Sequence, residues 1–151
     1  MLKPRASLQQ GFTLIEVLVA LLILAVGLLG AAALQLSALK YTDSALMSSQ
    51  ASFIAYDMLD RIRANPDADY NLASLDDVSE PVTSEEARSQ DLHDFKNHIR
   101  DFAGHSASGR IQVLKRQVAI TIDWDDSRAG GGMQTFTLAS RVAVDPPGEG
   151  R

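Results

Sequence analysis

The sequence predicts an α+β protein in which a long N-terminal helix packs on a small antiparallel β-sheet, with an extra short helix. Three observations predict this class. An uncharged apolar run lies near the N-terminus, the segment that follows it lacks proline and glycine up to Ala64, and apolar residues alternate with polar ones after residue 110. With 151 residues, of which 46% are hydrophobic, the chain has room for one modest domain beyond the apolar run.

The first element is predicted to cross a membrane. From Val17 to Leu39 there are 23 residues without a formal charge, which as an α-helix would span the ~30 Å hydrocarbon core. Lys3 and Arg5 precede the run and Asp43 follows it, so the positive-inside rule predicts a cytoplasmic N-terminus and an outward segment after Lys40. The alternative is a secretory signal peptide cleaved within residues 30–33, but such peptides have apolar regions of only about 7 to 15 residues.

Ahead of the run, Gly11-Phe12-Thr13-Leu14-Ile15-Glu16 resembles the processing site of type IV prepilins, which lies behind a short basic leader. This resemblance implies that a prepilin peptidase cuts between Gly11 and Phe12 on the cytoplasmic side and then methylates the new amino group of Phe12. Glycine before the scissile bond gives a protease close access to the backbone, because it has no Cβ. Residues 1–11 are therefore expected to be a leader peptide.

Glu16 is a charge at the front of a hydrophobic span, where it costs up to about 2.5 to 3.5 kcal/mol by insertion scales. In the filament that the resemblance implies, its partner would be the α-amino group of a neighbouring subunit, and this pair would set the register of assembly. The alternative is that Glu16 only reaches the lipid headgroups. Gly27 and Gly30 lie inside the span, either as points of close helix packing or as points where the helix melts during assembly.

The helix is predicted to run from about Phe12 to Ala64, roughly 80 Å, with residues 12–39 in the membrane and residues 40–65 as its amphipathic periplasmic half. Apolar residues in the second half recur at spacings of three or four and predict a packed stripe: Met47, Ala51, Ile54, Met58 and Ile62, with Leu46, Phe53 and Leu59 beside them. Asp57 and Arg61 are four residues apart and can form an exposed helical pair. Asn65-Pro66 ends the helix.

The end of this helix, from Ser52 to Pro66, resembles the minor pilins of the type IV pilus modification protein PilV family, which often close it with a similar "RAN" pattern. The family has a type IV pilin-like fold, the same architecture that the sequence pattern predicts. Many pilins clamp the C-terminal region with a disulfide, whereas this chain has no cysteine. Its globular part must therefore be held together by packing.

Residues 66–145 are predicted to form a small globular α+β domain, followed by a flexible tail at 146–151. Polar residues from Pro66 to Pro81 indicate a loop. Thr83 and Glu86 have the spacing of a capping box, and apolar residues predict a helix over 84–103 that ends at Gly104: Leu92, Phe95, Ile99 and Phe102.

An antiparallel hairpin should follow, connected through residues 127–132. The alternating residues that predict its packed face are Leu114, Val118, Ile120, Ile122 and Trp124 on one side, and Phe136, Leu138, Val142 and Val144 on the other. Ile111 and Val113 have the opposite parity, which leaves a bulge near Lys115-Arg116 or a separate short strand as alternatives.

The sequence contains no recognisable catalytic motif, and neither an enzyme nor a cofactor is expected. His93 and His98 are five residues apart, which is not the spacing of a metal pair on a helix, and His105 falls in a loop. Asp123, Asp125 and Asp126 cluster at the end of the hairpin, but Arg128 stands where a calcium-binding loop needs glycine. A solvated turn is the favoured interpretation of this cluster.

The resemblance implies a minor pilin, a structural subunit that initiates assembly of a type IV pilus and forms its tip complex. The expected partners are prepilin peptidase, other minor pilins, the major pilin, a pilus tip adhesin and inner-membrane lipid. The protein would sit in the bacterial inner membrane with its globular domain in the periplasm and then enter the pilus, a fimbrium used in twitching motility and cell adhesion. A net charge of −5 argues against nucleic acid as a partner, and hence against a competence pseudopilin. The alternatives are a minor pseudopilin of a type II secretion system and a single-pass envelope binding protein.

Overall fold

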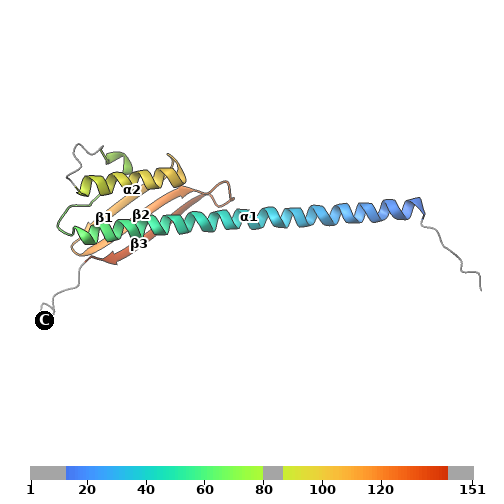
Figure 1. The fold of residues 1–151 in the computed structure, drawn as a ribbon, viewed down its shortest axis with the longest axis horizontal. Helices are drawn as coiled ribbons and strands as arrows, with labels where there is room; N and C mark the ends of the chain where they lie inside the picture. The colour runs from blue at the N-terminus through green and yellow to red at the C-terminus, as the bar shows by residue number, and fades with distance from the viewer. Residues whose placement is uncertain (1–12, 80–86, 143–151) are drawn as a thin grey trace, which may run out of the picture. The chain divides into compact units, whose positions relative to one another are not determined.

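The computed structural model describes residues 13–79 and 87–142 and contains three helical segments and three strands. They follow the order α1 (Leu14–Ala64), η1 (Leu75–Asp77), α2 (Ala87–Ala103), β1 (Ser108–Leu114), β2 (Gln117–Asp125) and β3 (Met133–Arg141) (Figure 1). The chain divides into two compact units, residues 1–39 and residues 40–151. The predicted α+β class is confirmed, with a long N-terminal helix, a second short helix and an antiparallel sheet.

Helix α1 is 51 residues long, and within the described residues it is the one helix whose length and apolar composition would allow it to cross a membrane. Its predicted end at Ala64 is confirmed, since Pro66 lacks the N–H that a helix interior requires. The predicted start at Phe12 lies outside the described residues. In the first unit, every large apolar side chain from Leu14 to Leu39 is exposed.

In the second unit, one face of α1 is buried and forms part of the core. The buried residues recur at helical spacing: Ala51, Ala55, Met58, Leu59 and Ile62. Met47 and Ile54 pack at the margin of this core. The prediction was wrong for Leu46 and Phe53, which are exposed, because they lie on the opposite side of the helix.

The sheet has the strand order β1-β2-β3, with each strand antiparallel to the next. A separate strand β1 therefore precedes the predicted hairpin, which confirms that alternative. The turn between β1 and β2 contains Lys115, whose φ of 58° is left-handed, and this tight reversal ends β1 at Leu114. Leu114 was wrongly predicted to pack: it belongs to β1 and is exposed, whereas Ile111 of the same strand is buried.

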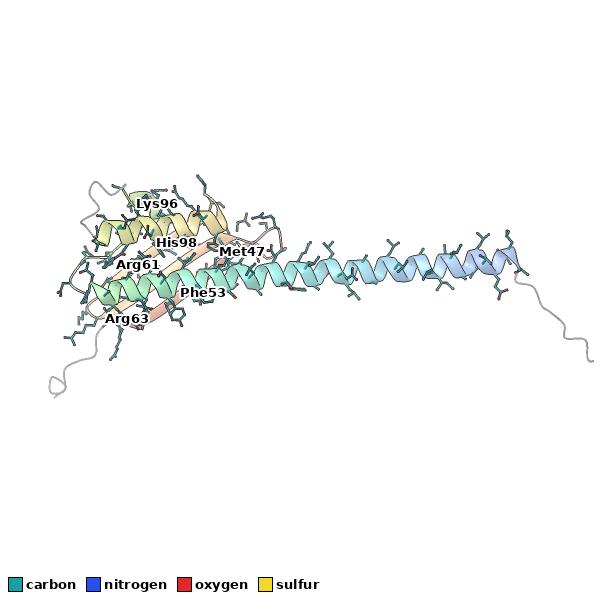
Figure 2. The ribbon with its side chains drawn as sticks, viewed as in Figure 1. Met47, Phe53, Arg61, Arg63, Lys96 and His98 are labelled. Atoms are coloured by element: carbon teal, nitrogen blue, oxygen red, sulfur yellow. The ribbon has the colours of Figure 1, made fainter. Side chains whose placement is uncertain are left out.

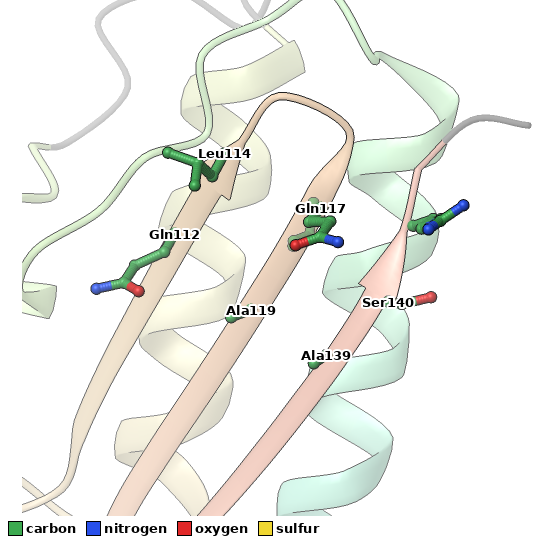
Figure 3. Close-up of a pocket in the computed structure, with 8 residues that line it drawn as sticks. Gln112, Leu114, Gln117, Ala119, Ala139 and Ser140 are labelled. Carbon is green, nitrogen blue, oxygen red and sulfur yellow. The ribbon is translucent and has the colours of Figure 1, made fainter. Parts of the chain in front are cut away.

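Within residues 13–79 and 87–142, helices cover one face of the sheet and not the other. Helix α2 and the C-terminal part of α1 lie against this face, which carries the buried residues of β2, as Figures 1 and 3 show from different sides. The buried residues of β2 are Val118, Ile120, Ile122 and Trp124. Trp124 also meets the ring of Phe102 edge-on, with ring centroids 6.0 Å apart. No element within the described residues covers the opposite face, which we call the open face.

Residues 65–79, which follow α1, have more regular structure than the predicted loop. Leu72 exchanges two backbone hydrogen bonds of 2.9 Å with Ile111, so this short stretch pairs with the outer edge of β1. The 3₁₀ turn η1 follows, and Ser74 and Asp77 cap it reciprocally. Tyr70 is fully buried before it. These elements are too short, at three residues or fewer, to produce a periodic pattern in the sequence.

Helix α2 presents Leu92, Phe95 and Ile99 to the core, as predicted. The predicted cap Thr83 and residues 84–86 lie outside the described residues. At the other end, Gly104 adopts a φ of +80° and donates its N–H to the carbonyl of Arg100 at 2.8 Å. This left-handed cap confirms the predicted stop at Gly104.

Candidate functional site

The N-terminal part of α1 carries the predicted assembly residue. Gly11 and Phe12 lie outside the described residues, and Thr13 immediately precedes the helix. The backbone N–H of Glu16 donates to the carbonyl of Thr13 at 3.0 Å and to its hydroxyl at 3.3 Å. Thr13 therefore caps α1. Glu16 is the third residue of the helix, where the negative charge of a carboxylate interacts favourably with the positive end of the helix dipole.

Beyond Glu16, the large apolar side chains of the first unit are exposed, and none of the described residues covers them. Both Gly27 and Gly30 could accept a Cβ without meeting any atom within 4 Å. Neither glycine is therefore required for packing inside the subunit. Their small size would matter only against a second chain or for helix flexibility.

At the other end of α1, the side chain of Arg61 forms three ion pairs, and only 28% of it is exposed. Its Nε donates to Asp57 at 2.9 Å, and its Nη1 donates to Asp91 at 2.9 Å and to Asp94 at 3.0 Å. Figure 2 shows Arg61 on the side of α1 that faces α2. The predicted pair with Asp57 is present, but Arg61 also joins the two helices, which the sequence analysis missed.

This arrangement stabilises the protonated, charged form of Arg61. Burial acts to lower the pKa of the guanidinium, but the hydrogen bonds to Asp91 and Asp94 and the charge of Asp57 outweigh it and raise that pKa. Tyr70 completes the cluster by donating its hydroxyl to Asp91 at 2.7 Å. Burial and this hydrogen bond raise the pKa of Tyr70 to about 12. We call these five residues, Asp57, Arg61, Tyr70, Asp91 and Asp94, the helix junction.

The three aspartates at the end of the predicted hairpin do not converge. Asp123 accepts hydrogen bonds from Ser108 at 2.9 Å and Thr135 at 2.7 Å, across the sheet. The carboxylate of Asp125 accepts from the hydroxyl and backbone N–H of Ser127, which lowers the pKa of Asp125.

Asp126 is buried under the loop that follows β2, where its backbone N–H donates to the carbonyl of Gly132 at 2.8 Å. His93 and His98 lie on α2, and His105 lies in the loop after it. Among residues 13–79 and 87–142, no three His, Cys, Asp or Glu side chains are placed to hold a metal ion.

Comparison with known proteins gives two adjoining family matches. Residues 6–32 match the prokaryotic N-terminal methylation motif, and residues 33–91 match the family of type IV pilin Tt1218. No curated protein and no solved structure matches the chain.

These matches cover different parts of the structure. The first contains the segment from Gly11 to Glu16 and much of the apolar part of α1. The second contains the packed half of α1 and extends to Asp91 of the helix junction. With the fold described above, these matches support a type IV pilin subunit: residues 6–32 match the methylation motif and residues 33–91 match a type IV pilin domain, and pilins are structural subunits rather than enzymes.

Proposed function

We propose that this chain is a minor pilin of the PilV family, which helps to initiate assembly of a type IV pilus and takes part in its tip complex. Residues 1–11 are the leader, residues 12–39 cross the inner membrane with the N-terminus in the cytoplasm, and residues 40–145 form the periplasmic part. Prepilin peptidase cleaves between Gly11 and Phe12 and methylates Phe12. Other minor pilins, the major pilin and a tip adhesin are the partners.

The observation that carries this proposal is a carboxylate at the start of an uncovered apolar helix. Glu16 is the fifth residue after the predicted cleavage point between Gly11 and Phe12. The large apolar side chains from Leu14 to Leu39 are exposed in the isolated chain. Lipid or neighbouring helices must cover such a surface. The amino group of Phe12 in another subunit is the charge that Glu16 would meet in a low-dielectric filament core.

Glu16 also has a local role that competes with this proposal. The backbone N–H of Glu16 donates to the hydroxyl of Thr13, and in a capping box with this spacing the carboxylate of Glu16 would accept from the backbone N–H of Thr13 and so stabilise the start of its own helix. Glutamine serves a capping box as well as glutamate does, but it carries no charge. This difference separates the two roles.

The first experiment is mass spectrometry of the mature protein purified from membranes. We expect loss of residues 1–11 and addition of one methyl group on the amino terminus at Phe12. An intact leader would show instead a single-pass envelope protein with an accidental motif, and cleavage after residues 30–33 would show a signal peptide.

The second experiment compares Glu16→Gln with Glu16→Ala. If Glu16 pairs with an amino terminus, both variants are cleaved normally, and both co-purify poorly with other pilins. If its role is only to cap α1, Glu16→Gln assembles like the parent chain. Neither variant is expected to affect folding of the second unit, because the hydrogen bonds of Glu16 lie within the first turn of α1.

The alternative is a minor pseudopilin of a type II secretion system. The methylation motif and the apolar helix would serve either assembly. A deletion strain scored for surface pili and for exoprotein release separates them. We expect loss of pili with normal secretion, and the opposite result would assign the chain to the secretion system.

A further inference from the structure

The open face of the sheet carries a shallow trough at the end where β1 turns into β2. We propose that this trough docks an extended acidic segment of another polypeptide. The proposal does not depend on which filament the subunit enters, because it concerns the isolated domain.

The register of the strands defines the trough. Leu114, Gln117 and Arg141 form the row nearest the turn, since Gln117 is paired with both of the others. In the next row on the same face, Ala119 lies between Gln112 and Ala139. The two alanines are short, so a depression of about 420 Å³ opens between the glutamines, Leu114 and Arg141 (Figure 3).

The trough offers the groups that an extended peptide needs. The amides of Gln112 and Gln117 can each donate and accept hydrogen bonds, as a peptide backbone requires. The alanine floor and the exposed Leu114 can contact apolar atoms. The volume is sufficient for two or three side chains, but not for a folded domain.

Basic residues gather at this end of an otherwise acidic chain. Lys115 and Arg116 form the turn beside the trough, and Arg141 lines it. Arg63, from the end of α1, lies near the same end but is paired with Asp60 at 3.1 Å, so it adds no net charge to the trough. The net charge of the whole chain is −5. This local reversal of charge is complementary to carboxylates, and it would steer an acidic segment toward the trough.

Other occupants fit less well. Single-stranded nucleic acid and many sugars stack on aromatic rings, and the side chains that line the trough include none. A second copy of this chain would find too little area. Three strands of seven to nine residues, spaced about 4.8 Å apart, expose roughly 400 Å² of face. This is half of what each partner in a standard stable interface buries, about 800 Å².

The test uses the full chain in detergent micelles and a fluorescent eight-residue peptide of alternating Asp and Thr, with an Asn-Thr peptide as its uncharged match. We expect anisotropy to report binding of the Asp-Thr peptide, weakened by salt. We expect Arg141→Gln combined with Lys115→Gln to reduce affinity about tenfold. Arg110→Gln is the matched control, because Arg110 lies on the same face but outside the trough.

A second variant, Ala139→Leu, tests the trough by shape rather than by charge. It fills the floor on the open face without entering the core, so binding should fall while the thermal midpoint stays unchanged. Several outcomes would overturn the proposal: no binding, equal loss in Arg110→Gln, tighter binding of single-stranded DNA or an alginate oligomer, or binding that appears only after truncation at Val142. The last result would identify the chain's own C-terminal segment as the occupant.

Discussion

Arg61 links α1 to α2 by ion pairs, in addition to the core that the two helices share. It bridges Asp57 of its own helix to Asp91 and Asp94 of the other. Without the guanidinium, three carboxylates would face one another, and Asp91 would keep only the hydroxyl of Tyr70 as a described partner.

We expect Arg61→Ala to lower the free energy of unfolding by about 1 to 3 kcal/mol, since it removes partly exposed, charge-assisted hydrogen bonds. Urea unfolding followed by far-UV circular dichroism measures this loss. Arg63→Ala is the control, because the described partners of Arg63 are an exposed aspartate and groups at the surface, and it should cost less than about 1 kcal/mol. Equal losses in the two variants would contradict the role given to Arg61.

Tyr70 makes the stability of the domain depend on pH in the alkaline range. Its pKa in the folded protein is about 12, against an ordinary value near 10. Because the folded pKa is the higher one, the neutral phenol contributes stability that is fully present below pH 10 and is lost as the pH rises toward 12.

The measurement is the ultraviolet absorbance of ionised tyrosine in the parent chain minus that in Tyr70→Phe. We expect the difference to rise with a midpoint near pH 12. The same pair of proteins, unfolded in urea, should show a midpoint near pH 10. A midpoint near 10 in the folded protein would mean that Tyr70 is not enclosed by the helix junction.

Some of the contacts of Arg61 could be predicted from the sequence and others could not. The spacing of Asp57 and Arg61 predicted their pair, because helix geometry fixes neighbours four residues apart. The contacts of Arg61 with Asp91 and Asp94 span 30 and 33 residues, and they depend on how α2 docks. No local pattern encodes that docking. The aromatic Tyr70 in a polar stretch was the one signal that could have indicated it.

At the scale of elements, Gly109 controls how closely α2 and η1 approach β1. A Cβ at this position would lie 2.7 Å from Cδ1 of Ile99, 3.0 Å from Cδ2 of Leu75 and 3.1 Å from Cε1 of Phe95. All three side chains belong to the core. The missing side chain thus lets two elements pack on the same point of the strand.

We expect Gly109→Ala to destabilise the domain by about 1 to 3 kcal/mol through overpacking. Thermal or urea unfolding measures the change. Gly27→Ala is the matched control, since an added Cβ there meets no atom within 4 Å. Should Gly109→Ala unfold like its parent, the core around Ile99 must relax more easily than its burial indicates.

The alternation of apolar and polar residues predicted the buried face of β2 correctly but failed at the turn from β1 to β2. The pattern in β2 predicted which face is packed, and Val118, Ile120, Ile122 and Trp124 are all buried. Leu114 was assigned to that pattern because it has the same parity as Val118. The two-residue turn at Lys115-Arg116 reverses the chain, so parity cannot be carried from one strand into the next.

At the scale of the whole molecule, the exposed apolar residues of α1 are the feature that a single subunit does not explain. Phe53 is 74% exposed and lies on the side of α1 opposite the core (Figure 2). In the filament proposed above, contact with a neighbouring subunit would account for this exposure.

We expect Phe53→Ala to change the free energy of unfolding by no more than about 0.5 kcal/mol, as at other exposed positions. Co-purification with other pilins should fall, because an apolar contact is lost. Met58→Ala is the contrast, since Met58 is buried and its truncation should cost about 2 to 5 kcal/mol. Normal co-purification of Phe53→Ala would exclude Phe53 from the assembly surface.

The order of the strands has a consequence for folding kinetics. Each strand pairs with its neighbour in the sequence, and all three lie within residues 108–141. Such local pairing closes short loops, which favours rapid folding. The contacts of Arg61 with α2 and of Leu72 with Ile111 join positions 30 or more residues apart. We therefore expect the three-stranded sheet β1-β2-β3 to form first. Helices α1 and α2 and residues 65–79 would then pack on it.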